Sequence, residues 1–288
     1  MKTEYKTIKT TAVSPAIGAE ITGVDIAAGI SDEQFAEIRQ AYIDYGVIFF
    51  RHQVITPDQH IEFARRWGQI NVNRFFKPVE KHPMIAEVRK EADQTANIGG
   101  DWHTDHSYDQ IPAMGSILYA REVPTLGGDT LFASMYAACE ALSEAMKNTL
   151  LGLRAIHSSR HVFGESALDD RDIDDLGGRF HNAAAATQDA VHPVIIRHPL
   201  SGRPALYVNG DFTVKFEGWT KDESQPLLDF LYQHAQQNEF TCRFQWQKGS
   251  MAIWDNRATQ HYALNDYQGE LRLMHRITIE GEALTAAV

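Results

Sequence analysis

Apolar residues at helical spacing follow a capping signal at several points along the chain. The first such stretch opens with Ser-Asp-Glu-Gln at 31–34, a pattern typical of a helix N-terminus. Phe35, Ile38 and Tyr42 then share one face, and Gly46 supplies the stop. The same signals predict further helices over 56–68, over 134–152 in two pieces, and from 220 to 231.

Short runs rich in β-branched and aromatic residues separate these helices. Residues 47–50 are apolar throughout, which predicts a strand buried on both faces. Residues 271–280 alternate in polarity and predict the last strand. Further strands are predicted at 115–120, 194–196, 205–209, 240–246 and 251–254. With no internal repeat and no low-complexity linker, the pattern indicates a single domain over residues 1–288, mainly β with helices outside.

Residues 164–191 depart from this pattern. They contain an acidic cluster at 169–175 and a run of small and polar residues at 183–187. We predict a mobile surface insertion here, which is either a solvated loop or a functional lid.

Composition restricts the possible partners and the compartment. The formal net charge of −11 argues against nucleic-acid binding through the bulk surface. The chain has no run of about eighteen apolar residues, so no membrane span is expected, and its first residues have no apolar core like that of a secretory signal. Two cysteines, Cys139 and Cys242, form neither a disulfide framework nor a Cys-x-x-Cys metal site. A reducing cytoplasm is the simplest interpretation.

The stretch Asp-Trp-His-Thr-Asp at 101–105 places an imidazole and a carboxylate two residues apart. In extended backbone, His103 and Asp105 leave on the same face, so they can hold one metal ion from one edge. Trp-Asp-Asn-Arg at 254–257 leads to His261, a candidate third ligand. Two imidazoles and one carboxylate leave the opposite face of the ion open, which is typical of non-haem Fe(II) oxygen chemistry.

Competing chemistries have less support in the sequence. Structural zinc sites are closed and usually rich in sulfur, and a hydrolytic zinc helix would show His-Glu-x-x-His, which is absent. The Gly-x-Ser-x-Gly nucleophile motif is absent too. A zinc hydrolase that uses a His/Asp/His site stays open as an alternative.

Arg272 and Arg276 lie four residues apart on one predicted strand and so share a face. At the usual rise of a strand their backbones are about 13 Å apart. Two guanidinium groups on one face near a metal suggest two separate carboxylate-like anions. The alternative is a pair of surface arginines on an exposed strand face.

Three motifs together identify a protein family far more specifically than a single His-x-Asp pair does. They are Trp-His-Thr-Asp at 102–105, Gly-Gly-Asp-Thr at 127–130, and Trp-Asp-Asn-Arg at 254–257, which leads to His261, Arg272 and Arg276. On these residues the chain resembles the taurine and phenoxyalkanoate dioxygenases, a family of Fe(II)- and 2-oxoglutarate-dependent oxygenases. The resemblance extends from residues 18–25 to Gly281.

The resemblance implies a fold, cofactors and roles. The implied fold is a double-stranded β-helix, a jelly-roll-type core with flanking helices and the metal at the barrel mouth. The implied cofactors are Fe(II), 2-oxoglutarate as co-substrate and O₂, with succinate and CO₂ released as a substrate C–H bond is hydroxylated. The implied roles are as follows: His103, Asp105 and His261 are the catalytic iron ligands, Thr130 and Arg272 hold the distal carboxylate of 2-oxoglutarate, and Arg276 faces the acidic group of the substrate.

The chain departs from taurine dioxygenase where that enzyme meets its substrate. Asn73 and Phe76 stand in place of a His and a Tyr, and Gly99 replaces an Asn. Taurine is therefore not the expected substrate, and the pocket should be more apolar. Residues 87–92 and 162–164 look closest to the (R)-phenoxypropionate dioxygenases.

The expected substrate is a small organic anion, aryloxyalkanoate-like or a related carboxylate. Phe163 and Phe212 are expected to extend the pocket wall beside Asn73 and Phe76, and His106 is a further candidate contact because it follows a metal ligand. The alternatives are an alkylsulfonate or alkyl sulfate dioxygenase of the same family and a non-catalytic binding protein of the same fold. We also expect self-association into a homo-oligomer, without nucleic-acid or membrane partners.

Overall fold

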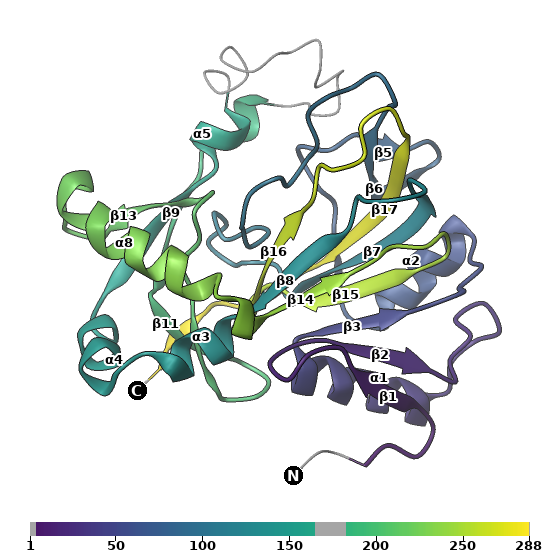
Figure 1. Cartoon of the computed structure of the whole chain (residues 1–288), viewed down its shortest axis with the longest axis horizontal. Coiled ribbons are helices and arrows are strands. Elements are labelled where there is room, and N and C mark those ends of the chain that lie inside the picture. Colours follow the sequence, from purple (N-terminus) through teal and green to yellow (C-terminus); the bar gives the residue numbers. More distant parts are fainter. Residues whose placement is uncertain (1–3, 165–182, 288) are drawn as a thin grey trace.

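The computed structural model describes residues 4–164 and 183–287, so residues 165–182 of the predicted lid lie outside the described residues. A nine-stranded sheet forms the largest layer (Figure 1). Its strands pair antiparallel except β2 and β3, which are parallel. In spatial order it contains β1 (Lys9–Ala12), β2 (Ala19–Thr22), β3 (Val47–Phe50), β15 (Met251–Asp255), β7 (Gly115–Glu122), β17 (Arg272–Ile279), β6 (His82–Lys90) and β5 (Pro78–Val79), with β4 (Ile70–Asn71) on β17.

A three-stranded sheet packs against one face of this layer. It consists of β14 (Thr241–Phe244), β8 (Thr130–Ser134) and β16 (Thr259–Ala263), in that order. Apolar residues of both sheets form one buried cluster between them. Phe49 of the large sheet stacks on Phe244 of the small one with ring centroids 4.0 Å apart. This shared core fixes β16 and β17, the strands that carry His261 and the two arginines, on opposite walls of one interior.

Helices α1 (Asp32–Tyr45) and α2 (Pro57–Arg65) pack on the large sheet through a second apolar cluster. Both begin where the capping signals predict. Thr56 forms a complete capping box with Gln59, whereas Ser31 accepts the backbone N–H of Gln34 without the reciprocal bond. The Gln34 amide instead donates to backbone carbonyls of the N-terminal segment, so a tertiary contact replaces the local one.

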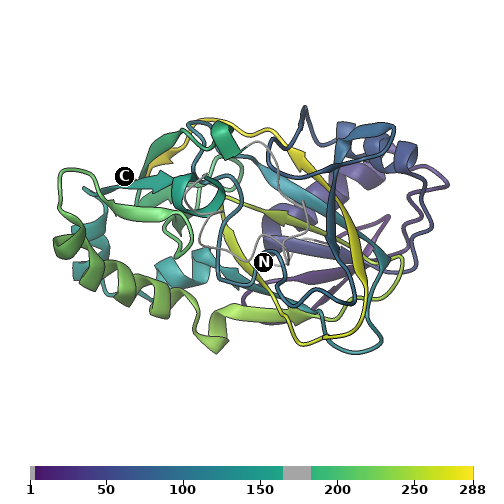
Figure 2. The same ribbon diagram turned by 90° about the horizontal axis from the view of Figure 1, so that it is seen from above.

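A second group of helices lies at the other end of the molecule (Figures 1 and 2). It contains α3 (Met135–Ala141), α4 (Glu144–Leu150) and α8 (Lys221–Ala235). Two small sheets complete it: β10 (Asp189–Pro193), β9 (Arg154–Ser158) and β13 (Thr213–Phe216), and β12 (Pro204–Leu206), β11 (Ile195–Arg197) and β18 (Thr285–Ala286). The short helix α5 (Arg160–Phe163) and the 3₁₀ turns Ala183–Ala185 and Asn238–Phe240 connect these elements.

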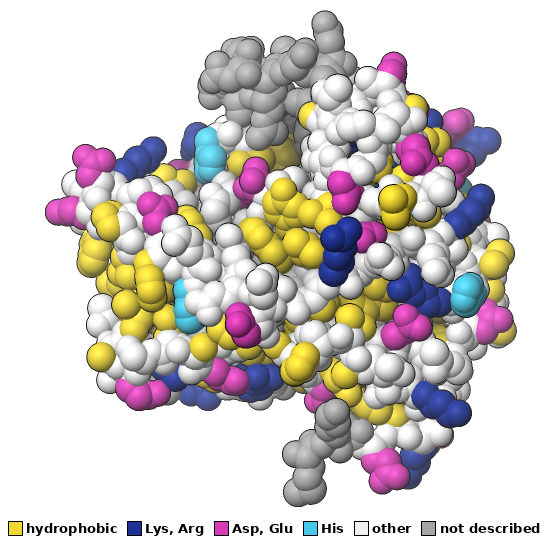
Figure 3. All heavy atoms as spheres, in the orientation of Figure 1, with side chains coloured by type: hydrophobic (Ala, Val, Ile, Leu, Met, Phe, Trp, Pro, Cys, Tyr) yellow, Lys and Arg dark blue, Asp and Glu magenta, His cyan; other side chains and the backbone are white. Residues whose placement is uncertain are grey.

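This arrangement confirms the predicted mixed, mostly sheet architecture with helices on the outside. The last residues of the predicted insertion begin β10, which pairs with β9. In the part of the chain that the structure describes, no helix is both long and apolar enough to cross a membrane. Acidic and basic side chains alternate over the face shown in Figure 3.

Candidate active site

A backbone contact joins the two distant motifs. His103 and His261 form an isolated antiparallel bridge, with His103 N–H donating to the His261 carbonyl at 3.1 Å and the reverse bond at 2.9 Å. The Thr104 hydroxyl adds a bond to the Thr259 carbonyl. Gly99 lies against this bridge with a φ of +77°, where a Cβ would come within 3.1 Å of the His103 ring. With this backbone, a larger residue at 99 would require a small shift of the His103 ring.

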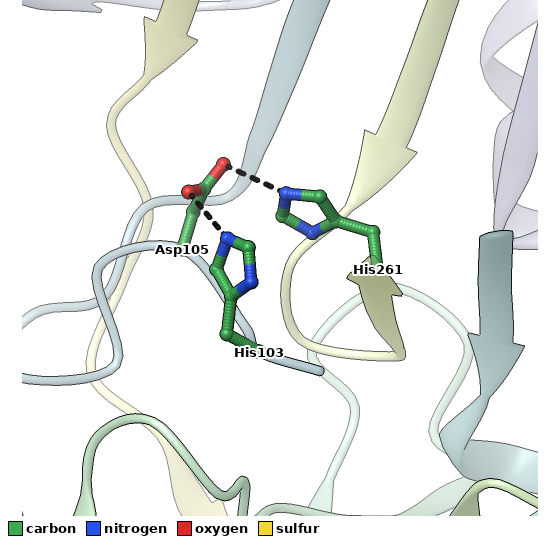
Figure 4. A group of neighbouring side chains, drawn as sticks. All are labelled: His103, Asp105 and His261. Atoms are coloured by element: carbon green, nitrogen blue, oxygen red, sulfur yellow. Dashed lines mark ion pairs between the residues drawn. The ribbon is translucent and has the colours of Figure 1, made fainter. Parts of the chain in front are cut away.

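His103, Asp105 and His261 form a candidate metal centre (Figure 4). One donor atom from each lies within 4.8 Å of the other two, and all three side chains are buried. Both imidazoles present Nε2 to the Asp105 carboxylate, at 3.7 Å from His103 and 4.0 Å from His261. These separations leave room for an ion between the donors, and imidazole with carboxylate suits Fe(II).

Residues around the three candidate ligands favour the protonation states that can bind a metal cation. The Asp101 carbonyl accepts a 2.8 Å bond from Nδ1 of His103, which leaves Nε2 unprotonated and free to coordinate. Burial, aided by the neighbouring His103, lowers the pKa of His261 well below its usual value. Burial alone would raise the pKa of Asp105, but Arg276 and the two imidazoles outweigh it and hold that pKa far below its usual range. Neutral imidazoles and an ionised carboxylate are the protonation states that a metal needs.

Arg276 lies beside the metal ligands. Its Nη1 donates to both oxygens of Asp105, at 3.0 and 3.2 Å, and the Ser116 hydroxyl donates to the same carboxylate. The guanidinium also covers the ring of Phe76 at 4.5 Å from the centroid, while its Nε is buried and has no hydrogen-bond partner among the described residues. The predicted substrate anchor is thus already engaged by a predicted metal ligand.

Arg272 has a different environment. Its Nε donates to the Gly128 carbonyl at 3.2 Å and its guanidinium lies 5.9 Å from the Trp246 ring. Among the described residues no carboxylate forms an ion pair with it, although it is only 6 % exposed. Trp246 also donates to the Thr130 hydroxyl at 2.9 Å. Thr130 and Arg272 therefore present a hydroxyl and an unneutralised cation to one space.

That space is a cavity of about 490 Å³. Its wall contains the three candidate metal ligands, both arginines and Thr130, so the predicted sharing of a face by Arg272 and Arg276 is confirmed. Phe76, Phe163 and Phe212 supply much of its apolar surface, as the sequence predicted. Trp254 packs against His261 with ring centroids 4.8 Å apart.

Asn73 and His106 are not among the cavity-lining residues. The side-chain Oδ1 of Asn73 accepts hydrogen bonds from the backbone N–H groups of Phe75 and Phe76. His106, with a φ of +59°, turns its ring toward Asn73 and bonds through Nδ1 to Asp109. Both residues support the cavity wall from behind, instead of forming it as the sequence predicted.

Several wall residues were absent from the predicted set, among them three polar residues of loops. Tyr108 lies in the turn after Asp105, Asp211 lies 3.7 Å from Nδ1 of His103, and Asn97 donates to the Ala263 carbonyl. All three belong to loops without periodic patterning, so only the position of Tyr108 close behind the metal motif offered a signal.

Comparison with known proteins gives one consistent family. Residues 9–278 match the family described as "Taurine catabolism dioxygenase TauD, TfdA family". The α-ketoglutarate-dependent sulfate ester dioxygenase of Pseudomonas putida is 34% identical over 271 residues, which cover 94% of this chain and 88% of that protein. The α-ketoglutarate-dependent 2,4-dichlorophenoxyacetate dioxygenase of Cupriavidus pinatubonensis is 31% identical over 268 residues, covering 86% and 88%.

A solved structure extends the agreement to three dimensions. The crystal structure of a taurine dioxygenase from Burkholderia xenovorans superposes with a TM-score of 0.82 at 31% identity, covering 98% of this chain and 93% of that one. These matches confirm the predicted family and enzyme class. The chain belongs to the TauD/TfdA family of α-ketoglutarate-dependent dioxygenases.

Proposed function

We propose that this enzyme hydroxylates a C–H bond of a small organic anion, using Fe(II), 2-oxoglutarate and O₂ and releasing succinate and CO₂. The observation that carries the proposal is the placement, in one cavity, of a two-histidine, one-carboxylate donor set beside a buried arginine without a carboxylate partner among the described residues. The donor set fits a divalent metal and the arginine fits an acidic co-substrate.

The proposed roles follow from these contacts. His103, Asp105 and His261 hold Fe(II), which with 2-oxoglutarate supplies the oxidising chemistry when bound. Arg272 and Thr130 bind the distal carboxylate of 2-oxoglutarate, because a guanidinium fork and a hydroxyl match its two oxygens. The aromatic wall keeps water away from the reacting carbon.

Arg276 is proposed to bind the anionic group of the substrate. Its guanidinium faces the cavity while one nitrogen, Nη1, is held by Asp105. This contact fixes the orientation of the guanidinium and leaves the rest of the fork for a second anion. Asn73 and His106 are proposed to act indirectly, by holding Phe76 and the turn that follows Asp105.

These roles also carry the finer structural proposals. The packing of the β14-β8-β16 sheet on the large sheet supports a double-stranded β-helix with the metal at its mouth. Because every proposed cofactor ligand lines the same cavity, we propose that residues 1–288 act as a single catalytic domain. A cytoplasmic location and self-association stay predictions.

The substrate headgroup has two candidates. A carboxylate on an aryloxyalkanoate suits the aromatic wall, and the 2,4-dichlorophenoxyacetate enzyme is 31% identical. A sulfate ester is favoured by the Pseudomonas putida relative at 34% identity. Both compounds carry an anionic group on an apolar body, so each would need a cation and an apolar wall in its binding site.

The test is succinate release with a panel of aryloxyalkanoates, alkyl sulfates and alkylsulfonates, each beside its neutral ester or alcohol. We expect turnover that requires Fe(II), O₂ and 2-oxoglutarate, and free anions that outperform neutral counterparts by up to about a hundredfold, since a hydrogen bond between charged groups contributes about 1.5–3 kcal/mol. Equal turnover of neutral and anionic compounds, or metal-dependent hydrolysis without O₂, would contradict the proposal.

A further inference from the structure

Tyr108 is the hydroxyl-bearing member of an otherwise apolar wall. It is 3 % exposed and lines the cavity together with Phe163 and Phe212. Its ring packs edge-on against Phe212 at 4.8 Å and against Phe163 at 5.9 Å between centroids. The guanidinium of Arg74 lies 5.3 Å from the ring on another side. This packing holds the ring in one orientation, so the hydroxyl has a fixed direction.

The Tyr108 hydroxyl has no hydrogen-bond partner within the part of the chain that the structure describes. The hydroxyls of Tyr108 and Tyr207 differ in their exposure. The Tyr207 hydroxyl is also unpartnered, but it is fully buried and Tyr207 is absent from the cavity wall. The Tyr108 hydroxyl is not among the fully buried unpaired atoms, and Tyr108 lines the cavity, so we infer that its hydroxyl reaches the cavity. Buried hydroxyls normally find a partner, so its partner is expected to be a ligand.

The electrostatic surroundings point toward the anionic end of a ligand. Burial, followed by the carboxylate of Asp109, raises the pKa of Tyr108 well above its usual value, so the hydroxyl is a proton donor at any working pH. Tyr108 and Arg276 line the same cavity, so one ligand in that cavity can meet both. Arg276 has already given Nη1 to Asp105, and its Nε is buried. Nη2 is then the Arg276 nitrogen without a described contact, so an anion with two or three oxygens still has acceptors for a further donor.

We propose that Tyr108 donates a hydrogen bond to an oxygen of the substrate's anionic headgroup and, with Arg276, determines which anions this enzyme accepts. The inference rests on the proposed function, because it assumes that the substrate's charge lies at Arg276. The headgroup chemistry is an oxyanion, either sulfate or carboxylate. A neutral hydroxyl adds affinity for both and avoids the cost of burying another full charge.

The experiment compares Tyr108→Phe with Tyr207→Phe, a matched loss of an unpartnered tyrosine hydroxyl outside the cavity. Full-length enzyme loaded with Mn(II) and the unreactive analogue N-oxalylglycine is titrated by calorimetry with hexyl sulfate and with phenoxyacetate. Succinate release with the same two compounds and Fe(II) gives KM and kcat.

We expect Tyr108→Phe to weaken binding of the preferred probe about tenfold or more, as for loss of a bond to a charged acceptor, mainly through KM. Affinity for 2-oxoglutarate should not change, and Tyr207→Phe should bind both probes like the wild type. The probe with the larger loss identifies the headgroup. Equal binding by Tyr108→Phe and the wild type, equal losses in both variants, or no binding of either probe by the wild type would overturn the proposal. Binding that depends on Tyr108 without succinate release would instead refute the proposed function alone.

Discussion

Arg272 allows a test of the co-substrate site that does not depend on turnover. In the ligand-free enzyme it is a buried cation with one backbone partner and an aromatic neighbour. Burial lowers its pKa, which means that the charged form is held at a cost. Arg272→Leu removes that cost together with one hydrogen bond worth about 1 kcal/mol. We therefore expect the ligand-free variant to match the stability of the wild type to within about 1 kcal/mol.

Adding 2-oxoglutarate should raise the melting temperature of the wild type much more than that of Arg272→Leu. At about a hundred times the dissociation constant, a ligand stabilises the folded state by about 2.7 kcal/mol. For a chain of 288 residues the unfolding entropy is about 0.6 kcal/mol/K, so Tm should rise by about 4 °C in the wild type. Loss of a bidentate charged contact should raise the dissociation constant of Arg272→Leu at least a hundredfold, which reduces the shift to below about 1 °C.

Thermal unfolding with Mn(II), with and without 2-oxoglutarate, measures both quantities. Arg197→Leu is the control, because Arg197 is exposed on β11, and it should keep the full shift. A wild-type shift in Arg272→Leu would show that another residue anchors 2-oxoglutarate. A ligand-free variant destabilised by about 3 kcal/mol or more would show that Arg272 has a strong partner in the empty site, and the reasoning about an uncompensated cation would be wrong.

Further predictions concern the metal, the co-substrate wall and acid stability. His261→Ala should lose Mn(II) binding, measured by calorimetry, by a hundredfold or so while keeping its circular dichroism spectrum, and unchanged binding would remove His261 from the ligand set. Trp246→Phe, which frees the Thr130 hydroxyl, should raise KM for 2-oxoglutarate several-fold with kcat little changed, whereas Trp219→Phe, outside the cavity wall, should change neither. Burial, and to a lesser extent the neighbouring His275, lowers the pKa of His60 to about 3. Below about pH 6.5, His60 is therefore protonated in the unfolded chain but not in the folded one. The free energy of unfolding consequently falls as the pH falls from 6.5 toward 3. When the pH is lowered from 6.5 to 5, the unfolding free energy measured by urea titration should fall by about 2 kcal/mol less in His60→Leu than in the wild type. An equal fall in both proteins would contradict the lowered pKa of His60.

The sequence was most informative where a motif fixed both residue type and position. His103, Asp105 and His261 could be named because their chemistry has few alternatives, and the structure brings them together through a backbone bridge. The shared face of Arg272 and Arg276 followed from strand periodicity alone. The inference about the arginines depends on the regular backbone of β17, whereas the metal ligands were identified from their motif, because Asp105 lies in a turn.

Inference from sequence failed where the backbone is irregular. His106 has a positive φ, which no local pattern indicates for a histidine, and its ring contacts Asn73 and Asp109 and is not part of the cavity lining. Tyr108 lies in the same turn and faces the cavity without any periodic signal. The pairing of Arg276 with Asp105 joins two segments distant in sequence, and strand periodicity gives the direction of a side chain but not its partner.

The charge balance of the cavity connects these observations to the choice of substrate. The buried ionised groups in its described wall are one carboxylate, Asp105, and two guanidiniums, Arg272 and Arg276. Adding a divalent metal would give these buried groups an excess of three positive charges, which the partly exposed carboxylate of Asp211 in the same wall offsets only in part. Dianionic 2-oxoglutarate removes two of them, and a monoanionic substrate removes the third. A neutral substrate would leave Arg276 to share a single carboxylate with the metal. The charges of the described wall therefore support the proposed preference for an anionic substrate, whatever the headgroup.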